Sequence, residues 1–145
     1  MNKAFATAPA FDIPFELNNA LNARRFALVA QPIYGQGTGA PVGHELLSRL
    51  VENNGELIPA GKFLQAAEQK KLMPTLDICT LQLLRDRILP YMPPGTQWWF
   101  ALNVSAMSLL NAEYLEKLLS PTWTHMAKKL VLEIPVTDFA KHKTI

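Results

Sequence analysis

The sequence predicts an α/β domain whose mostly parallel sheet begins with an antiparallel hairpin. Two observations support this fold class. Residues 26–35 and 42–50 are rich in apolar side chains, and the segment 36–41 between them contains the glycines and proline of a turn. Strand-like and helix-like segments then alternate along the chain, and this order favours parallel strands joined by right-handed crossovers.

The N-terminal part is expected to contain a leader and one short helix. Prolines and an aspartate interrupt the apolar stretch within residues 1–15, so we expect a flexible leader and not a signal peptide. Leu17 and Leu21 are four positions apart in the segment 16–25, which is the spacing of an amphipathic helix. After the hairpin, residues 51–59 are expected to form a loop.

Helices and strands alternate after this loop. A proline in the interior of a helix would break it, so Pro74 is expected to separate two helices. Ser108 is expected to cap the N-terminus of a later helix. The expected elements are helices at 60–72 and 74–89, a strand at 98–106, a helix at 108–120 and a strand at 129–136.

Composition excludes several classes of protein. The 145 residues carry 14 Lys and Arg against 12 Asp and Glu, a formal net charge of +2, which argues against a nucleic acid polymer as partner. The single cysteine, Cys79, allows no intrachain disulfide. No apolar run is long enough to span a bilayer. We therefore expect a cytoplasmic location, either free or as the cytoplasmic part of a membrane-anchored protein.

Polar residues interrupt the apolar strands near their carboxyl ends. Side chains alternate between the two faces of a strand, so Glu45 and Arg49 share one face. Asn103 and Glu133 lie on the later strands, and Gln31 is a fourth polar residue in the same setting. Ligand sites gather where parallel strands end. Two carboxylates and an amide oxygen are ligands that suit Mg²⁺ or Mn²⁺, and an arginine beside them suits a phosphate.

A purely structural interpretation of the same residues remains open at this point. Glu45 and Arg49 are close enough in sequence to form an ion pair within one strand. Asn103 precedes an expected helix, so its side chain fits a turn or a helix cap equally well. Only the joint pattern across three strands favours a site that binds a cation and a phosphate.

Five motifs in order resemble the EAL-domain family, the bacterial phosphodiesterases of cyclic di-GMP. The first strand and hairpin read AQPIYGQGTGAPVGHELLSR, where Glu45-Leu46-Leu47 stands at the triplet that names the family, with leucine in place of alanine. The segments IPAGKFLQAAEQKKL, LDICTLQLL, FALNVSAMSL and LVLEIPV follow in the family's order. The resemblance covers roughly residues 17–140.

The resemblance implies a TIM-like (β/α) barrel, of which this chain would form the N-terminal half. It implies hydrolysis of cyclic di-GMP to linear pGpG with Mg²⁺ or Mn²⁺ bound at the strand ends. It places metal ligands and substrate contacts at six positions of this sequence. The metal ligands are Glu45, Asn103 and Glu133, and the substrate contacts are Gln31, Leu47 and Arg49.

The chain also departs from the family pattern. Val136 stands near the place of the family's second glutamate after Glu133, and the later D-D-F-G strand and catalytic lysine have no counterpart. We therefore expect residues 16–145 to be an incomplete EAL domain that is inactive alone and contains no catalytic residue of its own. A missing C-terminal half or a second copy of the chain is expected to cover the open sheet edge. A degenerate domain that binds cyclic di-GMP or a protein without catalysis is the alternative function, and an unrelated α/β fragment is the third.

Overall fold

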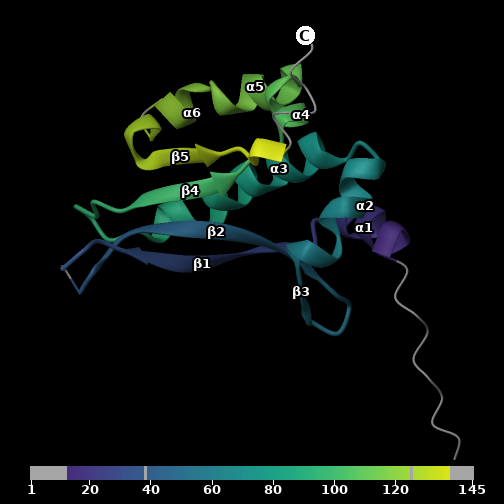
Figure 1. Cartoon of the computed structure of the whole chain (residues 1–145), viewed down its shortest axis with the longest axis horizontal. Helices are drawn as coiled ribbons and strands as arrows, with labels where there is room; N and C mark the ends of the chain where they lie inside the picture. The colour runs from purple at the N-terminus through teal and green to yellow at the C-terminus, as the bar shows by residue number, and fades with distance from the viewer. Residues whose placement is uncertain (1–12, 38, 125, 138–145) are drawn as a thin grey trace, which may run out of the picture.

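The computed structural model describes residues 13–37, 39–124 and 126–137, and its centre is a five-stranded sheet (Figure 1). β1 and β2 form the predicted antiparallel hairpin, whereas β2, β4 and β5 run parallel in the order β1-β2-β4-β5. β3 pairs antiparallel with β2 inside the segment expected to be a loop, and β2 itself extends to Val51, so that expectation was wrong for residue 51 and for residues 57–59. The strands are β1 (Phe26–Tyr34), β2 (Pro41–Val51), β3 (Leu57–Pro59), β4 (Trp99–Asn103) and β5 (Leu130–Glu133).

Helices connect the parallel strands, as the alternating pattern predicted. Pro74 lies in the first turn of α3, so the proline separates two helices as expected. The N-terminal helix begins at Ile13, before the boundary expected at residue 16, and residues 1–12 of the expected leader lie outside the described residues. The helical elements are α1 (Ile13–Asn22), η1 (Ala60–Lys62), α2 (Leu64–Gln69), α3 (Met73–Leu83), η2 (Leu84–Ile88), η3 (Leu89–Tyr91), α4 (Ala106–Leu109), α5 (Ala112–Leu118), α6 (Pro121–Thr124) and η4 (Ala127–Lys129).

The helix expected at 108–120 is divided into short helices with their own caps. The Ser105 hydroxyl accepts a hydrogen bond from the Met107 backbone N–H at 3.0 Å and caps α4. The Asn111 side chain accepts one from the Tyr114 N–H at 3.0 Å and caps α5. Ser108 lies inside α4 and is fully buried, so the prediction that it caps a helix was wrong. Asn111 competes for helix initiation because its side chain satisfies a free N–H of the next helix.

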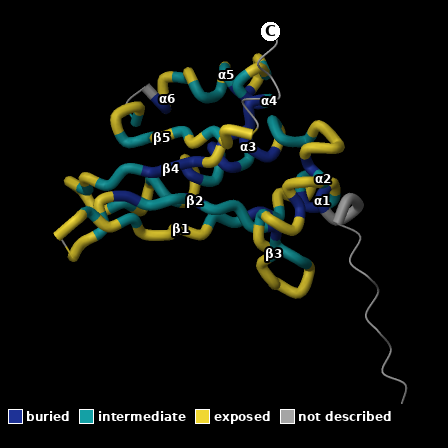
Figure 2. The backbone as a smooth tube through the Cα atoms, in the orientation of Figure 1, coloured by how far each residue is buried: buried dark blue, intermediate teal, exposed yellow. Residues whose placement is uncertain are grey.

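The hydrophobic core lies on one face of the sheet. Leu46, Phe100 and Leu102 project from β2 and β4 toward Leu81 and Leu84 on the helical stretch formed by α3 and η2. A second cluster joins α1 and α2 to the ends of the hairpin. Figure 2 shows this arrangement as buried residues along β4 and α3 and exposed residues along much of β1.

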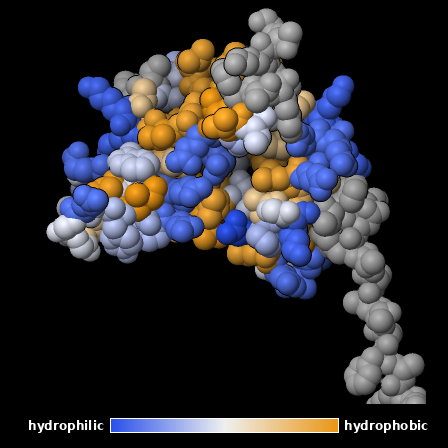
Figure 3. All heavy atoms as spheres, in the orientation of Figure 1, coloured by the Kyte–Doolittle hydropathy of each residue, from blue (hydrophilic) through white to orange (hydrophobic). Residues whose placement is uncertain are grey.

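The opposite face of the sheet is open. In Figure 1 α3 passes behind the strands, and the face turned to the viewer carries no described helix across β2 and β4. Val29 and Val131 are 36% and 42% exposed on this face, and Figure 3 shows polar and apolar side chains mixed over it. β1 and β5 each have one neighbouring strand within the described part of the chain. A second copy or a second half that would cover this face stays a prediction.

Trp99 lies on the open face at the start of β4, away from the carboxyl end of that strand. It pairs with Gly43 across β2 and β4. A Cβ atom added to Gly43 would lie 2.5 Å from two carbons of the Trp99 indole and 2.9 Å from its backbone oxygen. Glycine is therefore required here because the indole lies directly against the neighbouring backbone.

Candidate metal and phosphate site at the strand ends

Glu45, near the middle of β2, and Asn103, at the carboxyl end of β4, meet on the open face of the sheet. Nδ2 of Asn103 donates a hydrogen bond of 2.8 Å to Oε1 of Glu45, although the two residues are 58 positions apart in sequence. The strand register explains the contact, because Glu45 pairs with Ala101 and Asn103 lies two residues further along the same face. The sheet therefore brings together two of the three metal ligands that the resemblance implied.

Glu133 lies next to this pair on the third parallel strand. It is the register partner of Asn103 across β4 and β5, so both side chains leave the same face of the sheet. Glu133 and Asn103 are exposed and Glu45 is partly buried, which leaves their oxygens accessible from solvent. The hydrogen bond joins Asn103 to Glu45 and the register places Glu133 on the same face, while the role of the three residues as metal ligands stays a prediction.

The donor set has the chemistry of a site for a hard divalent cation. Two carboxylates and an amide oxygen are ligands that suit Mg²⁺ or Mn²⁺, and a cation held this way would take Glu45, Asn103 and Glu133. Within residues 13–37, 39–124 and 126–137, no group of three or more His, Cys, Asp or Glu residues could hold a metal ion. The set here has two carboxylates, so further ligands would have to come from water, phosphate or another segment.

Two of the structural roles considered for these residues are not observed in the described part of the chain. Nη1 of Arg49 donates to the Ser48 backbone carbonyl at 2.9 Å, and no ion pair joins Glu45 to Arg49 in the described residues. Asn103 does not cap the next helix, because Ser105 does. The interaction of Asn103 with Glu45 therefore remains as its observed role.

The predicted substrate-contact residues surround this cluster. Gln31 is the register partner of Glu45 in the hairpin and is exposed. Leu47 and Arg49 follow Glu45 on the same face at intervals of two residues, and both are partly buried. The sheet thus places all six predicted residues on one face, with Arg49 furthest along β2.

A cavity of about 260 Å³ opens beside the cluster at the carboxyl ends of the strands. Its walls are mainly apolar, with a few polar groups from the β4–α4 turn and from α3. A concave apolar surface next to charged groups is a common setting for an organic ligand. The lining residues are Leu46, Leu47, Ser48, Ala60, Leu64, Met73, Leu76, Asp77, Asn103, Val104, Ser105 and Pro135.

Asp77 supports the site and was missed by the sequence analysis. It is 4% exposed on α3, where its Oδ2 accepts hydrogen bonds from the Ser105 backbone N–H at 2.9 Å and from the Ser108 hydroxyl at 2.6 Å. These bonds fix the turn that directly follows Asn103. The signal was present in the sequence, because an aspartate interrupts an apolar helical segment and a buried carboxylate requires such partners.

His44 lies on the other face of β2 from Glu45. Its ring contacts Trp98 edge to face, with 4.7 Å between ring centroids, and lies 6.3 Å from the ring of Phe100. These contacts make His44 part of the aromatic packing on the helix side of the sheet. It takes no part in the strand-end cluster.

The chain belongs to the EAL-domain family, whose family model matches residues 16–144. Its fold is that of a TIM-like barrel over the part that the chain covers. A comparison with curated protein sequences finds no match. The described residues contain no helix with the length and apolar character needed to cross a membrane.

Solved structures of EAL domains are similar to this chain. The FimX EAL domain of Pseudomonas aeruginosa bound to c-di-GMP has a TM-score of 0.68 and 23% identity, over 92% of this chain and 54% of its own. The phosphodiesterase PaMucR in complex with c-di-GMP has a TM-score of 0.68 and 24% identity, over 84% of this chain and 51% of its own. The LapD S helix-GGDEF-EAL protein of Vibrio cholerae, bound to c-di-GMP, has a TM-score of 0.72 and 19% identity. The match covers 91% of this chain and 32% of the LapD chain. The chain therefore spans about half the length of the FimX and PaMucR chains and about a third of the LapD chain.

Proposed function

We propose that this chain carries part of a site for the hydrolysis of cyclic di-GMP to linear pGpG in bacterial signalling. The contact between Asn103 and Glu45 is the observation that supports the proposal most directly, because it joins two polar side chains from neighbouring parallel strands on the open face. Membership of the EAL-domain family and likeness to EAL structures that are bound to c-di-GMP support the choice of ligand.

In this proposal Glu45, Asn103 and Glu133 hold a divalent cation, either Mg²⁺ or Mn²⁺. When bound, the cation supplies a Lewis acid that polarises the phosphate and lowers the pKa of a coordinated water. Asn103 has a second role, because its N–H donates to Glu45 and orients that carboxylate while its amide oxygen remains available. The side chains on the sheet therefore set the position of the cation.

The substrate contacts in this proposal are Gln31, Leu47 and Arg49. Arg49 carries a planar guanidinium that can donate two parallel hydrogen bonds to one phosphate. Gln31 offers amide groups at the hairpin, and Leu47 offers apolar surface beside the strand-end cavity. The whole enzyme's activity requires further groups, so we propose that this chain binds cation and dinucleotide but does not turn the substrate over alone.

The proposal is tested by binding and turnover measurements on the chain. Mn²⁺ is titrated by calorimetry, and c-di-GMP is titrated with and without Mn²⁺ while pGpG is followed by chromatography. We expect Mn²⁺ to bind, to tighten c-di-GMP binding, and to produce no pGpG. Glu45→Gln should weaken Mn²⁺ binding by roughly tenfold, in the range found when an ordering or ligating group is lost. Absence of Mn²⁺ binding by the unaltered chain would contradict the proposal.

A non-catalytic receptor is the second candidate function. Val136 is 83% exposed shortly after Glu133, near the position of a family glutamate, so one oxygen ligand is absent from this segment. Replacing Val136 by glutamate distinguishes the candidates. Tighter Mn²⁺ binding by Val136→Glu would support a site that has lost a ligand, whereas unchanged binding would show that this position faces elsewhere.

A further inference from the structure

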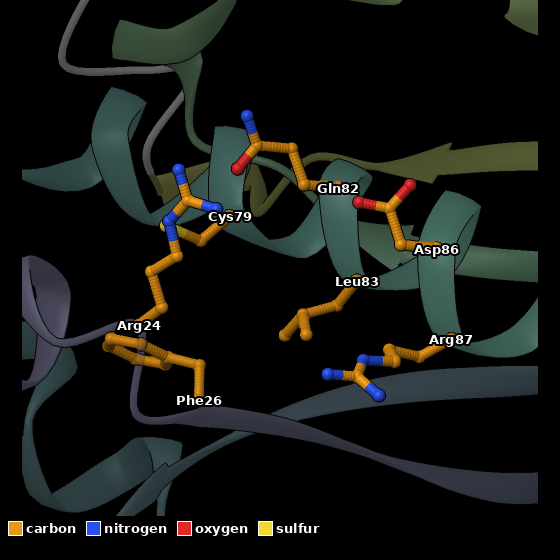
Figure 4. A pocket seen from close by; sticks show the side chains of 7 residues that line it. All are labelled: Arg24, Phe26, Cys79, Gln82, Leu83, Asp86 and Arg87. Atoms are coloured by element: carbon orange, nitrogen blue, oxygen red, sulfur yellow. The ribbon is translucent and has the colours of Figure 1, made fainter.

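A second cavity lies on the helix side of the sheet, away from the strand-end cluster. It has a volume of about 150 Å³ and opens between the start of β1 and the helical stretch formed by α3 and η2 (Figure 4). Phe26 is buried in the core on this side of the sheet, which is the face opposite to Glu45. The lining residues are Arg24, Phe26, Cys79, Gln82, Leu83, Asp86 and Arg87.

The cavity carries excess positive charge. Arg24 enters from the turn between α1 and β1, and Arg87 enters from η2, so two guanidinium groups approach the hollow from different sides (Figure 4). Neither guanidinium forms a hydrogen bond or an ion pair with another described residue. Both lie near enough to lower the pKa of Asp86, after the larger effect of its hydrogen bond to Arg85.

The single acid of the cavity is already compensated. Arg85 donates two hydrogen bonds to the Asp86 carboxylate, from Nε at 2.6 Å and from Nη2 at 2.9 Å. This bidentate pair occupies both carboxylate oxygens. Asp86 is therefore only a partial counter-charge for Arg24 and Arg87, whose two positive charges exceed the one negative charge among the lining residues.

The remaining groups favour an anion over a cation or an apolar ligand. Burial raises the pKa of the Cys79 thiol, so no thiolate competes for Arg24 near neutral pH. Gln82 also lines the cavity, and Figure 4 shows its amide oxygen on the side of the Arg24 guanidinium and its amide nitrogen turned away. Phe26 and Leu83 supply an apolar floor between the exposed side chains of Arg24 and Arg87.

We propose that this cavity binds the terminal phosphate of a small phosphomonoester. Two guanidiniums from separate elements suit the dianion of a monoester better than the single charge of a diester. The volume admits a phosphate group and leaves the rest of the molecule in solvent. The site is independent of the strand-end cluster, because no residue lines both cavities.

The test uses the full chain with inorganic phosphate, GMP and c-di-GMP as probes. Calorimetry measures each affinity, and NMR follows the Nε–H signals of Arg24 and Arg87. We expect phosphate and GMP to bind with Kd values of about a millimolar or tighter and to shift both arginine signals. Arg24→Gln and Arg87→Gln should each weaken GMP binding at least tenfold, which is roughly the effect of losing one charge-assisted hydrogen bond.

Matched variants separate this site from surface charge and from the strand ends. Lys128→Gln removes one positive charge outside the cavity and should change GMP affinity less than twofold. Asp86→Asn removes the competing carboxylate and should tighten binding. Glu45→Gln should leave GMP binding unchanged. Failure of the proposal for this cavity is therefore distinguishable from failure of the proposed function at the strand ends. Three outcomes would overturn the proposal. One is an equal loss of GMP affinity with Lys128→Gln, and another is the absence of saturable GMP binding. The third is that c-di-GMP shifts the Nε–H signals of both arginines as much as GMP does.

Discussion

Asp77 and Ser105 are joined by a hydrogen bond that connects the buried helix α3 to the strand-end site. The Ser105 backbone N–H donates to Oδ2 of Asp77 at 2.9 Å across 28 positions of sequence. The same oxygen accepts from the Ser108 hydroxyl at 2.6 Å. Ser105 follows Asn103 by two residues, so the hydrogen bond anchors the turn that begins directly after Asn103.

Replacing Asp77 by alanine is expected to destabilise the fold. The Ser105 N–H and the Ser108 hydroxyl would both lose their acceptor in a buried setting, and each lost partner costs about 1–3 kcal/mol. We therefore expect the free energy of unfolding to fall by about 2–4 kcal/mol, as measured by urea denaturation. Asp77→Asn retains an acceptor oxygen and should lose about half as much. Equal stability of the alanine variant and the unaltered chain would contradict this role.

The Asp77→Asn variant also tests whether the turn positions Asn103. It should remain folded and bind Mn²⁺ several-fold more weakly, because outer contacts that orient a ligand affect affinity by roughly tenfold or more. The Asn103 side-chain amide signals in NMR should shift at the same time. Unchanged Mn²⁺ affinity in a folded Asp77→Asn variant would limit Asp77 to a purely structural role.

Asn103→Asp is predicted to make stability depend on a divalent cation. The change replaces an N–H donor 2.8 Å from Glu45 by a second carboxylate, so two negative charges would face each other. In EDTA we expect the unfolding free energy to fall by about 0.5–1 kcal/mol, a small effect because the site is exposed. Mn²⁺ should restore it and bind more tightly than to the unaltered chain.

The control for this variant is Asn111→Asp, which changes the same residue type at a helix cap where an aspartate is accepted. It should show no dependence on Mn²⁺. If Asn103→Asp were equally stable in EDTA and in Mn²⁺, the two carboxylates would not share a cation, and the proposed metal site would have to be abandoned.

The sequence predicted the strand-end cluster well because strand geometry has a fixed period. A period of two placed Glu45 and Arg49 on one face, and the carboxyl ends of parallel strands brought Asn103 and Glu133 to the same edge. The proline at residue 74 also predicted a real break between helices. The face of each side chain and the helix break follow from local sequence, and the meeting of the strands follows from the alternating order of strands and helices.

Other features depended on contacts between distant segments. Ser108 resembled a helix cap locally, yet its hydroxyl donates to Asp77 from inside α4. The short strand β3 forms because residues 57–59 return to pair with β2, and no local signal in the loop indicated that pairing. The cavity between Arg24 and Arg87 likewise requires the packing of β1 against α3 and η2, which the sequence does not reveal.

Gly43→Ala is predicted to destabilise the sheet beneath the site. The new methyl group would lie 2.5 Å from the Trp99 indole and 2.9 Å from its backbone oxygen, so the β2–β4 pairing would have to shift. Overpacking of this kind costs about 1–3 kcal/mol, which urea denaturation would measure. Gly61→Ala is the matched control, because nothing lies within 4 Å of the added Cβ, and it should change stability by less than about 0.5 kcal/mol. Similar stabilities for the two variants would mean that Trp99 does not lie against Gly43.

Tyr114 gives a prediction about alkaline stability. Its side chain is fully buried, its hydroxyl has no hydrogen-bond partner in the described residues, and burial, aided by the charge of Asp77, raises the pKa of the phenol well above its usual value. In the unfolded chain the phenol ionises near pH 10. The unfolded state therefore releases a proton first, and the free energy of unfolding falls as the pH rises above about 10 toward the raised pKa of the folded state.

Tyr114→Phe should remove this alkaline loss and should stabilise the chain slightly at neutral pH, by up to about 1 kcal/mol, because an unpaired buried hydroxyl is deleted. Thermal or urea unfolding between pH 8 and about 11 would measure both effects. Tyr91→Phe is the matched control, since the Tyr91 side chain is 78% exposed, and it should keep the pH dependence of the unaltered chain. A Tyr114→Phe variant that is less stable at neutral pH would show that the hydroxyl has a partner, such as a buried water, and that its contribution to folding is favourable.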